Sequence, residues 1–179
     1  MYKADYLNFI DINVGKKHDV KNGSYSIWIC DPEENYGYKI YFKKWGGPCN
    51  FMVSKKLRTR TKLQSKYGYK LLEMENLEKY FKFCNKLFNL GLIPEPLEIF
   101  IYKSVYGIKT TKIPPVTSDK LWEDRYNILL PSYCKIWTDY YSEWLLGDKQ
   151  RHNFGQVGNK LLMLDIDVHG MEDIRKTIQ

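Results

Sequence analysis

Two stretches decide the fold that the sequence predicts: Gly147-Asp148-Lys149-Gln150-Arg151-His152-Asn153-Phe154-Gly155 and Leu161-Leu162-Met163-Leu164-Asp165-Ile166-Asp167. Between them, Gly158-Asn159 is a two-residue turn signal that separates an extended stretch from an apolar one. The spacing predicts a hairpin in which Val157 pairs with Lys160.

The register of this hairpin brings three oxygen-bearing side chains together. Asn153 falls opposite Leu164, so Asp165 lies beside Asn153, at the same end of the ladder as Asp148. Phosphoryl transfer needs such a set, because one carboxylate orients the attacking hydroxyl and accepts its proton. A second carboxylate and an amide oxygen hold Mg²⁺, which prefers oxygen ligands. The alternative interpretation is that Asp148 and Asn153 cap turns by bonding their own backbone.

The pattern Asp-x-x-x-x-Asn, with a hairpin and a second Asp after apolar residues, resembles the catalytic motifs of the kinase-like superfamily. Its form here is more similar to small-molecule phosphotransferases, lipid-kinase-like enzymes and HipA-type toxin kinases than to ordinary eukaryotic protein kinases. The resemblance implies that Asp148 is the catalytic base and that Asn153 and Asp165 are metal ligands. Asp167 is the alternative ligand, since two strand residues return to the same face.

An antiparallel, five-stranded small lobe is expected ahead of this motif. The predicted strands are Tyr6–Val14, Tyr25–Cys30, Tyr38–Lys44, Leu97–Tyr102 and Tyr106–Ile113. Gly15–Ser24 is expected to be a loop, and Asp31–Gly37 consists of turn residues. The loop takes the place of the glycine-rich loop of kinases but lacks the pattern G-x-G-x-x-G.

Tyr36–Lys44 resembles the third-strand V-A-I-K motif of that superfamily. The resemblance implies that Lys39 holds the nucleotide phosphates and that Gly37 leaves room for the adenine. The alternative interpretation is a solvated lysine on an edge strand, where such charges discourage aggregation.

A long helix is predicted over Lys66–Asn89, because apolar residues recur there at three- and four-residue spacing before Gly91. Its position resembles that of the αC helix, which supplies a glutamate to the strand lysine. Glu78 would be that partner of Lys39, with Glu75 as the alternative. Either could equally be a solvated helix charge paired with a nearby lysine.

The resemblance assigns Thr110–Pro115 to the hinge, where the backbone of Lys112 and Ile113 would hold the adenine edge. Asp119–Trp144 is amphipathic and predicts one or two helices broken near Pro131. The expected fold is therefore α+β: one kinase-like domain over residues 1–179. Residues 1–113 form its small lobe, and residues 114–179 form a truncated, mainly helical large lobe.

Composition limits the classes of protein that fit. The chain has 179 residues, of which 44% are hydrophobic, so one domain with a real core is expected. Four scattered cysteines without C-x-x-C indicate reduced thiols in the cytoplasm, and three histidines make a zinc site a poor fit. Neither a signal peptide nor a bilayer-length apolar run is recognisable, so no membrane association is expected. The net charge of +7 favours anionic partners.

The sequence thus predicts a minimal atypical protein kinase that binds ATP with Mg²⁺, or Mn²⁺ in its place. It would transfer the γ-phosphate to a hydroxyl of a protein substrate, a Ser or Thr. Three alternatives are a nucleotide-binding pseudokinase, a small-molecule phosphotransferase and a basic nucleic-acid-binding protein. The last is suggested by the net charge and by the basic cluster over residues 55–62.

Overall fold

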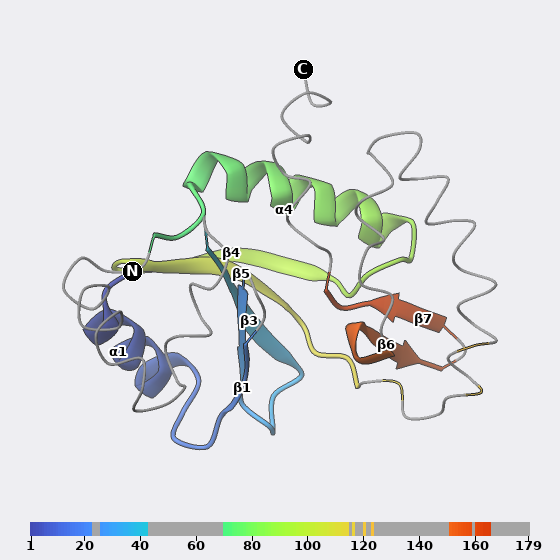
Figure 1. Ribbon diagram of the computed structural model, residues 1–179, viewed down its shortest axis with the longest axis horizontal. Helices are drawn as coiled ribbons and strands as arrows, with labels where there is room; N and C mark the ends of the chain where they lie inside the picture. Colours follow the sequence, from blue (N-terminus) through green and yellow to red (C-terminus); the bar gives the residue numbers. More distant parts are fainter. Residues whose placement is uncertain are drawn as a thin grey trace, which may run out of the picture. The chain divides into compact units, whose positions relative to one another are not determined.

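A computed structural model describes residues 1–22, 26–42, 70–114, 116, 120, 123, 151–158 and 160–165. The elements in chain order are α1 (Lys3–Asn13), β1 (Asp19–Asn22), β2 (Ser26–Cys30), β3 (Tyr36–Tyr41), α4 (Met74–Asn89), β4 (Pro96–Tyr102), β5 (Val105–Thr111), η3 (Arg151–Asn153), β6 (Phe154–Val157) and β7 (Lys160–Met163). The fold is α+β (Figure 1). The chain divides into two compact units, Met1–Lys82 with Pro96–Lys112, and Phe83–Glu95 with Ile113–Gln179.

The first unit contains a five-stranded antiparallel sheet in the order β1-β2-β3-β5-β4. An antiparallel sheet of five strands is therefore confirmed, but its first strand is β1 instead of the predicted Tyr6–Val14. The strand β3 is central in this sheet. Lys39 of β3 lies opposite Trp28 of β2 and Ile108 of β5. Because opposed residues in a ladder point to the same face, these three side chains share one face of the sheet.

The other face of the sheet is covered by α1, a helix formed where the sequence predicted the strand Tyr6–Val14. That prediction was wrong, because the residues that become buried, Tyr6, Phe9 and Ile10, follow helical spacing. The Phe9 ring lies 5.1 Å from the ring of Tyr38 and 4.9 Å from that of Phe100. This apolar layer, which also contains Ile29, forms the core of the unit.

The helix α1 is also fastened to the turn between β4 and β5. The Ser104 hydroxyl donates to the Asp5 carboxylate and accepts a hydrogen bond from the backbone N–H of Tyr2 at 2.8 Å. Polar groups of α1 thereby fix one end of the helix, while its apolar side chains cover the sheet.

Burial of Tyr6 predicts a loss of stability at alkaline pH. Desolvation raises the pKa of Tyr6 to about 12 from its ordinary value of 10.0. Above pH 10 the unfolded chain loses this phenolic proton while the folded chain keeps it, so the free energy of unfolding falls between about pH 10 and 12. Urea unfolding from pH 8 to 11.5 should show a shallower fall for Tyr6→Phe than for the wild type. An identical pH profile for the two proteins would contradict the effect.

The boundaries of several other elements also differ from the prediction. The strand β3 begins at Tyr36, inside the predicted turn Asp31–Gly37. The expected loop Gly15–Ser24 contains β1, whose Val20 lies opposite Ile29. The long helix begins at Met74 instead of Lys66. Residues 66–69 are outside the described part, and the N–H of Leu72 donates to the Tyr41 carbonyl at 3.0 Å, so the chain before the helix runs extended beside β3. The helix ends before Gly91, as predicted, and Gly91 has φ 71°.

The second unit contains the hairpin of β6 and β7, which has the predicted register. Val157 pairs with Lys160, and the N–H of Leu164 donates to the Asn153 carbonyl at 2.7 Å. The chain after β5 runs along β6, because the Pro114 carbonyl accepts from Gln156 at 3.0 Å. The N–H of Met163 donates to the Leu92 carbonyl at 2.9 Å. The hairpin is thus held on both sides by other parts of its own unit.

Of the predicted helices over Asp119–Trp144, only Lys120 and Glu123 are among the described residues. Among the helices that the structure describes, none has the length and apolar character needed to cross a membrane.

Candidate functional site

Lys39 is a buried lysine at the centre of a sheet. Its side chain is 8% exposed, and its Nζ atom lies 5.6 Å from the centre of the Tyr41 ring. The strand β3 has neighbours on both sides, so Lys39 is not the solvated edge lysine of the alternative interpretation. Burying an ammonium group is costly unless it is compensated, which makes such a position uncommon for a lysine without a specific role.

Gly37 shares the face of Lys39, and the room beside it is occupied by Trp28. A Cβ atom at position 37 would overlap the indole of Trp28 and lie 2.9 Å from the Ile29 carbonyl oxygen. The glycine is therefore required for the indole to approach the backbone of β3 this closely. One face of the sheet therefore carries Trp28, Gly37 and Lys39 next to one another.

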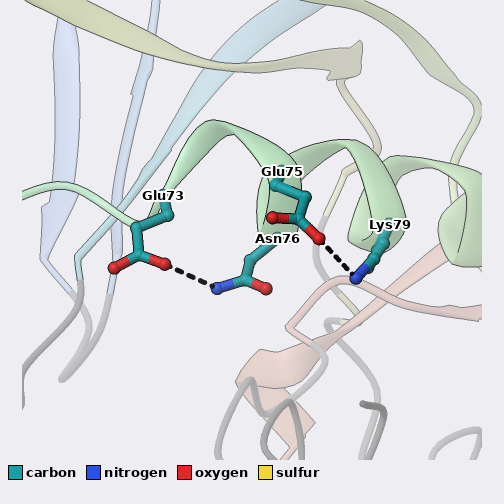
Figure 2. A network of polar contacts seen from close by, with 4 residues as sticks. All are labelled: Glu73, Glu75, Asn76 and Lys79. Carbon is teal, nitrogen blue, oxygen red and sulfur yellow. Dashed lines mark hydrogen bonds and ion pairs between the residues drawn. The ribbon is translucent and has the colours of Figure 1, made fainter.

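The two candidate partners of Lys39 lie on α4, and Figure 2 shows the polar contacts around one of them. The Glu75 carboxylate pairs with Lys79 Nζ at 2.8 Å, one turn along the helix. Glu78 is exposed, and the described residues include no ion pair between it and Lys39.

The orientation of α4 explains this arrangement. The ring of Tyr80 on α4 packs against that of Tyr41 on β3, with centroids 5.0 Å apart. Successive helical residues are ~100° apart, so Glu75 and Glu78 lie about 140° and 160° around the helix from Tyr80. Both glutamates thus start from the side of α4 away from this contact with β3.

The expected hinge residues, Lys112 and Ile113, make contacts with different parts of the protein. The Lys112 backbone N–H donates to the Asn35 carbonyl at 2.7 Å, and its Nζ donates to the Pro32 carbonyl at 2.8 Å. These bonds fasten the end of β5 to the turn between β2 and β3. Ile113 belongs to the second unit, where its side chain lies against Gly155 of β6. The Lys112 N–H is therefore already used within the protein.

Asn153 and Asp165 are brought to the same end of the hairpin of β6 and β7. Asn153 is 6% exposed and is followed directly by β6, whereas Asp165 is exposed two residues after β7. Since the Asn153 carbonyl bonds the N–H of Leu164, the backbone of Asp165 follows one residue later. A buried asparagine and an exposed aspartate are therefore neighbours along the backbone, and their side chains carry oxygen atoms of the kind that hard divalent cations prefer.

Asp148 and Asp167, the remaining predicted site residues, lie outside the described residues. Within the described ranges, no group of three or more His, Cys, Asp or Glu side chains could hold a metal ion. The structure places one asparagine and one aspartate at this end of the hairpin, and a metal site would need Asp148 or Asp167 in addition.

Trp28 is the residue that the sequence did not single out. A signal was nonetheless present, because an antiparallel register that pairs β2 with β3 puts an aromatic side chain opposite Lys39. Comparisons with protein-family models, with curated proteins and with solved structures gave no significant match to this chain.

Proposed function

We propose that this chain is a minimal atypical protein kinase. It would transfer the γ-phosphate of ATP to a Ser or Thr hydroxyl of a partner protein. The observation that carries the proposal is the burial of Lys39 at the centre of the five-stranded sheet. A cation held in that position, on one face with an aromatic residue and a glycine, suits the binding of an anionic nucleotide.

The arrangement of the sheet also supports the proposal. The helix α4 is inserted between β3 and β4, and the hairpin of β4 and β5 completes the sheet. This is the order of elements that the resemblance to the kinase-like superfamily implies for a small lobe. The helix α1 is an addition to that plan, and it covers the face of the sheet opposite Lys39.

The second unit contains the residues that we propose for metal binding and proton transfer. Asn153 and Asp165, with Asp167 as the alternative to Asp165, would hold Mg²⁺ or Mn²⁺, which supplies charge neutralisation for the phosphates when bound. Asp148 would orient the acceptor hydroxyl and accept its proton. Lys39 would hold the nucleotide phosphates by charge. Because Glu75 and Glu78 start from the side of α4 away from β3, neither is assigned as the carboxylate partner of Lys39.

Nucleotide binding through Lys39 is testable by thermal unfolding. A ligand at one hundred times its dissociation constant stabilises a protein by about 2.7 kcal/mol, which raises the melting temperature of a chain of this size by about 5–10 °C. We expect such a shift with millimolar Mg²⁺-ATP, and we expect Lys39→Met to lose at least half of it.

Lys109 offers a matched control. It lies on the neighbouring strand β5, paired with Glu98 at 3.3 Å, and it shares the opposite face with Tyr38. Lys109→Met should keep the full shift. No shift in the wild type, or equal losses in the two variants, would remove the nucleotide-binding role of Lys39.

A second candidate function is that of a pseudokinase, which would bind a nucleotide or a partner without transferring phosphate. The indole of Trp28 favours it, because this side chain occupies the room beside Gly37 that the resemblance assigns to the adenine. Incubation with γ-labelled ATP and Mg²⁺ separates the two candidates, since only the kinase would transfer label to a protein.

A further inference from the structure

The strand β4 is an edge of the five-stranded sheet. Within the described residues no strand pairs with its outer side. An irregularity between Pro96 and Glu98 interrupts its ladder, so the regular part of the edge is Glu98–Tyr102. An edge strand presents unpaired N–H and C=O groups, to which another chain can add.

The hairpin turn determines which backbone groups face outward. Lys103 and Ser104 form a two-residue turn that is flanked by the pair Tyr102 and Val105. Residues that flank such a turn exchange both hydrogen bonds, and the pattern then alternates along the strand. The N–H and C=O groups of Ile99 and Ile101 therefore point away from β5. Ile101 is 68% exposed, so the outer edge carries an apolar side chain rather than a protective charge.

We propose that two copies of this chain pair through β4, antiparallel, about a twofold axis at Phe100. In this register Ile99 of each copy lies opposite Ile101 of the other. Both are residues whose backbone groups face outward, so the two pairs would form four hydrogen bonds. The two isoleucines of each pair also share one face of the combined sheet, where they cover each other.

Charge favours a second copy over an unrelated extended peptide. The same register puts Glu98 opposite Tyr102 of the partner copy, and the Nζ of Lys103 lies 5.5 Å from the centre of the Tyr102 ring. The Glu98 side chain is 59% exposed and pairs with Lys109 of its own copy at 3.3 Å. In the dimer each Glu98 would also meet Lys103 of the partner copy, and the twofold axis creates this second contact twice.

The contact is short, because five residues of a strand span about 17 Å. Interfaces of this kind bury less surface than permanent dimers do. We therefore expect a reversible dimer with a dissociation constant of roughly 10–100 µM. The pairing involves only the first unit, and it does not depend on the proposed function.

Sedimentation velocity over a range of about 1–300 µM tests the pairing. The wild type should shift from monomer to dimer with concentration. Ile101→Lys should remain monomeric, because a lysine on an edge strand opposes pairing. Ile12→Lys is the matched control, since Ile12 is 69% exposed but lies on α1, and this variant should dimerise as the wild type does. A monomeric wild type, a dimer that survives Ile101→Lys, or a loss of dimer in the control would each overturn the proposal.

Lys103→Asn provides a second test, which keeps the turn intact. Lys103 has φ 50°, a conformation that Asn adopts readily, so this variant should fold with an unchanged or higher melting temperature. Loss of the two ion pairs should raise the dissociation constant about fivefold and remove most of its salt dependence. An unchanged dissociation constant would overturn the register, even if Ile101→Lys failed to fold.

Discussion

Asp148→Asn is expected to lower phosphate transfer by about 10²-fold or more while leaving the stabilisation by Mg²⁺-ATP nearly intact. The substitution keeps the size of the side chain but removes its charge and its ability to accept a proton, and a general base contributes on that scale. The measurement compares transfer of label from γ-labelled ATP with the nucleotide-induced change in melting temperature. Transfer should fall while the thermal shift remains.

Asp165→Asn is the comparison that separates the two aspartates. If Asp165 holds the metal, this variant should lose both transfer and the metal-dependent part of the thermal shift. If Asp148 merely caps a turn, Asp148→Asn should instead cost about 1 kcal/mol of stability and leave transfer alone. An Asp148→Asn protein that is less stable but transfers label at the wild-type rate would remove Asp148 from the catalytic assignment.

Gly107→Ala is expected to reduce the free energy of unfolding by about 3 kcal/mol, the upper part of the range for overpacked positions. A Cβ atom at this position of β5 would overlap the Lys39 carbonyl oxygen and lie 3.0 Å from the Phe100 ring. The backbone of β3 cannot easily move aside, because β3 is paired on both sides. Urea unfolding measures the loss.

Gly91→Ala is the matched control for this substitution. Nothing lies within 4 Å of a Cβ atom at position 91, so only the positive φ of 71° opposes alanine there. The expected cost is about 1 kcal/mol. Equal losses in the two variants would show that the close approach of β5 to β3 adds nothing to the cost of a side chain at position 107.

Local signals in the sequence were sufficient to predict the hairpin of β6 and β7. A two-residue turn with glycine fixes the register of the strands on either side, so the pairing of Val157 with Lys160 could be predicted. The hairpin of β4 and β5 was also predicted, but its turn contains no glycine, and the second strand begins at Val105 instead of the predicted Tyr106. The candidate metal ligands Asn153 and Asp165 were brought to one end by this register alone.

Three features depend on packing between distant segments and could not be predicted from local sequence. Tyr6–Val14 is compatible with both periods, and it became the helix α1 because Phe9 and Ile10 find a sheet face formed by strands far along the chain. The burial of Lys39 likewise depends on β5, which follows it by some 70 residues, because β5 turns β3 from an edge into the central strand. The direction of Glu78 on α4 required the contact of Tyr80 with Tyr41.

The bond between Asp5 and Ser104 joins residues 99 positions apart, and this separation has a consequence for synthesis on the ribosome. At about 5–20 residues per second, the helix α1 would wait roughly 5–20 s for its partner turn to be translated. During that interval the nascent chain would present Phe9 and Ile10 without the sheet that later covers them. The first unit should therefore be a client of ribosome-associated chaperones until β5 has emerged from the exit tunnel.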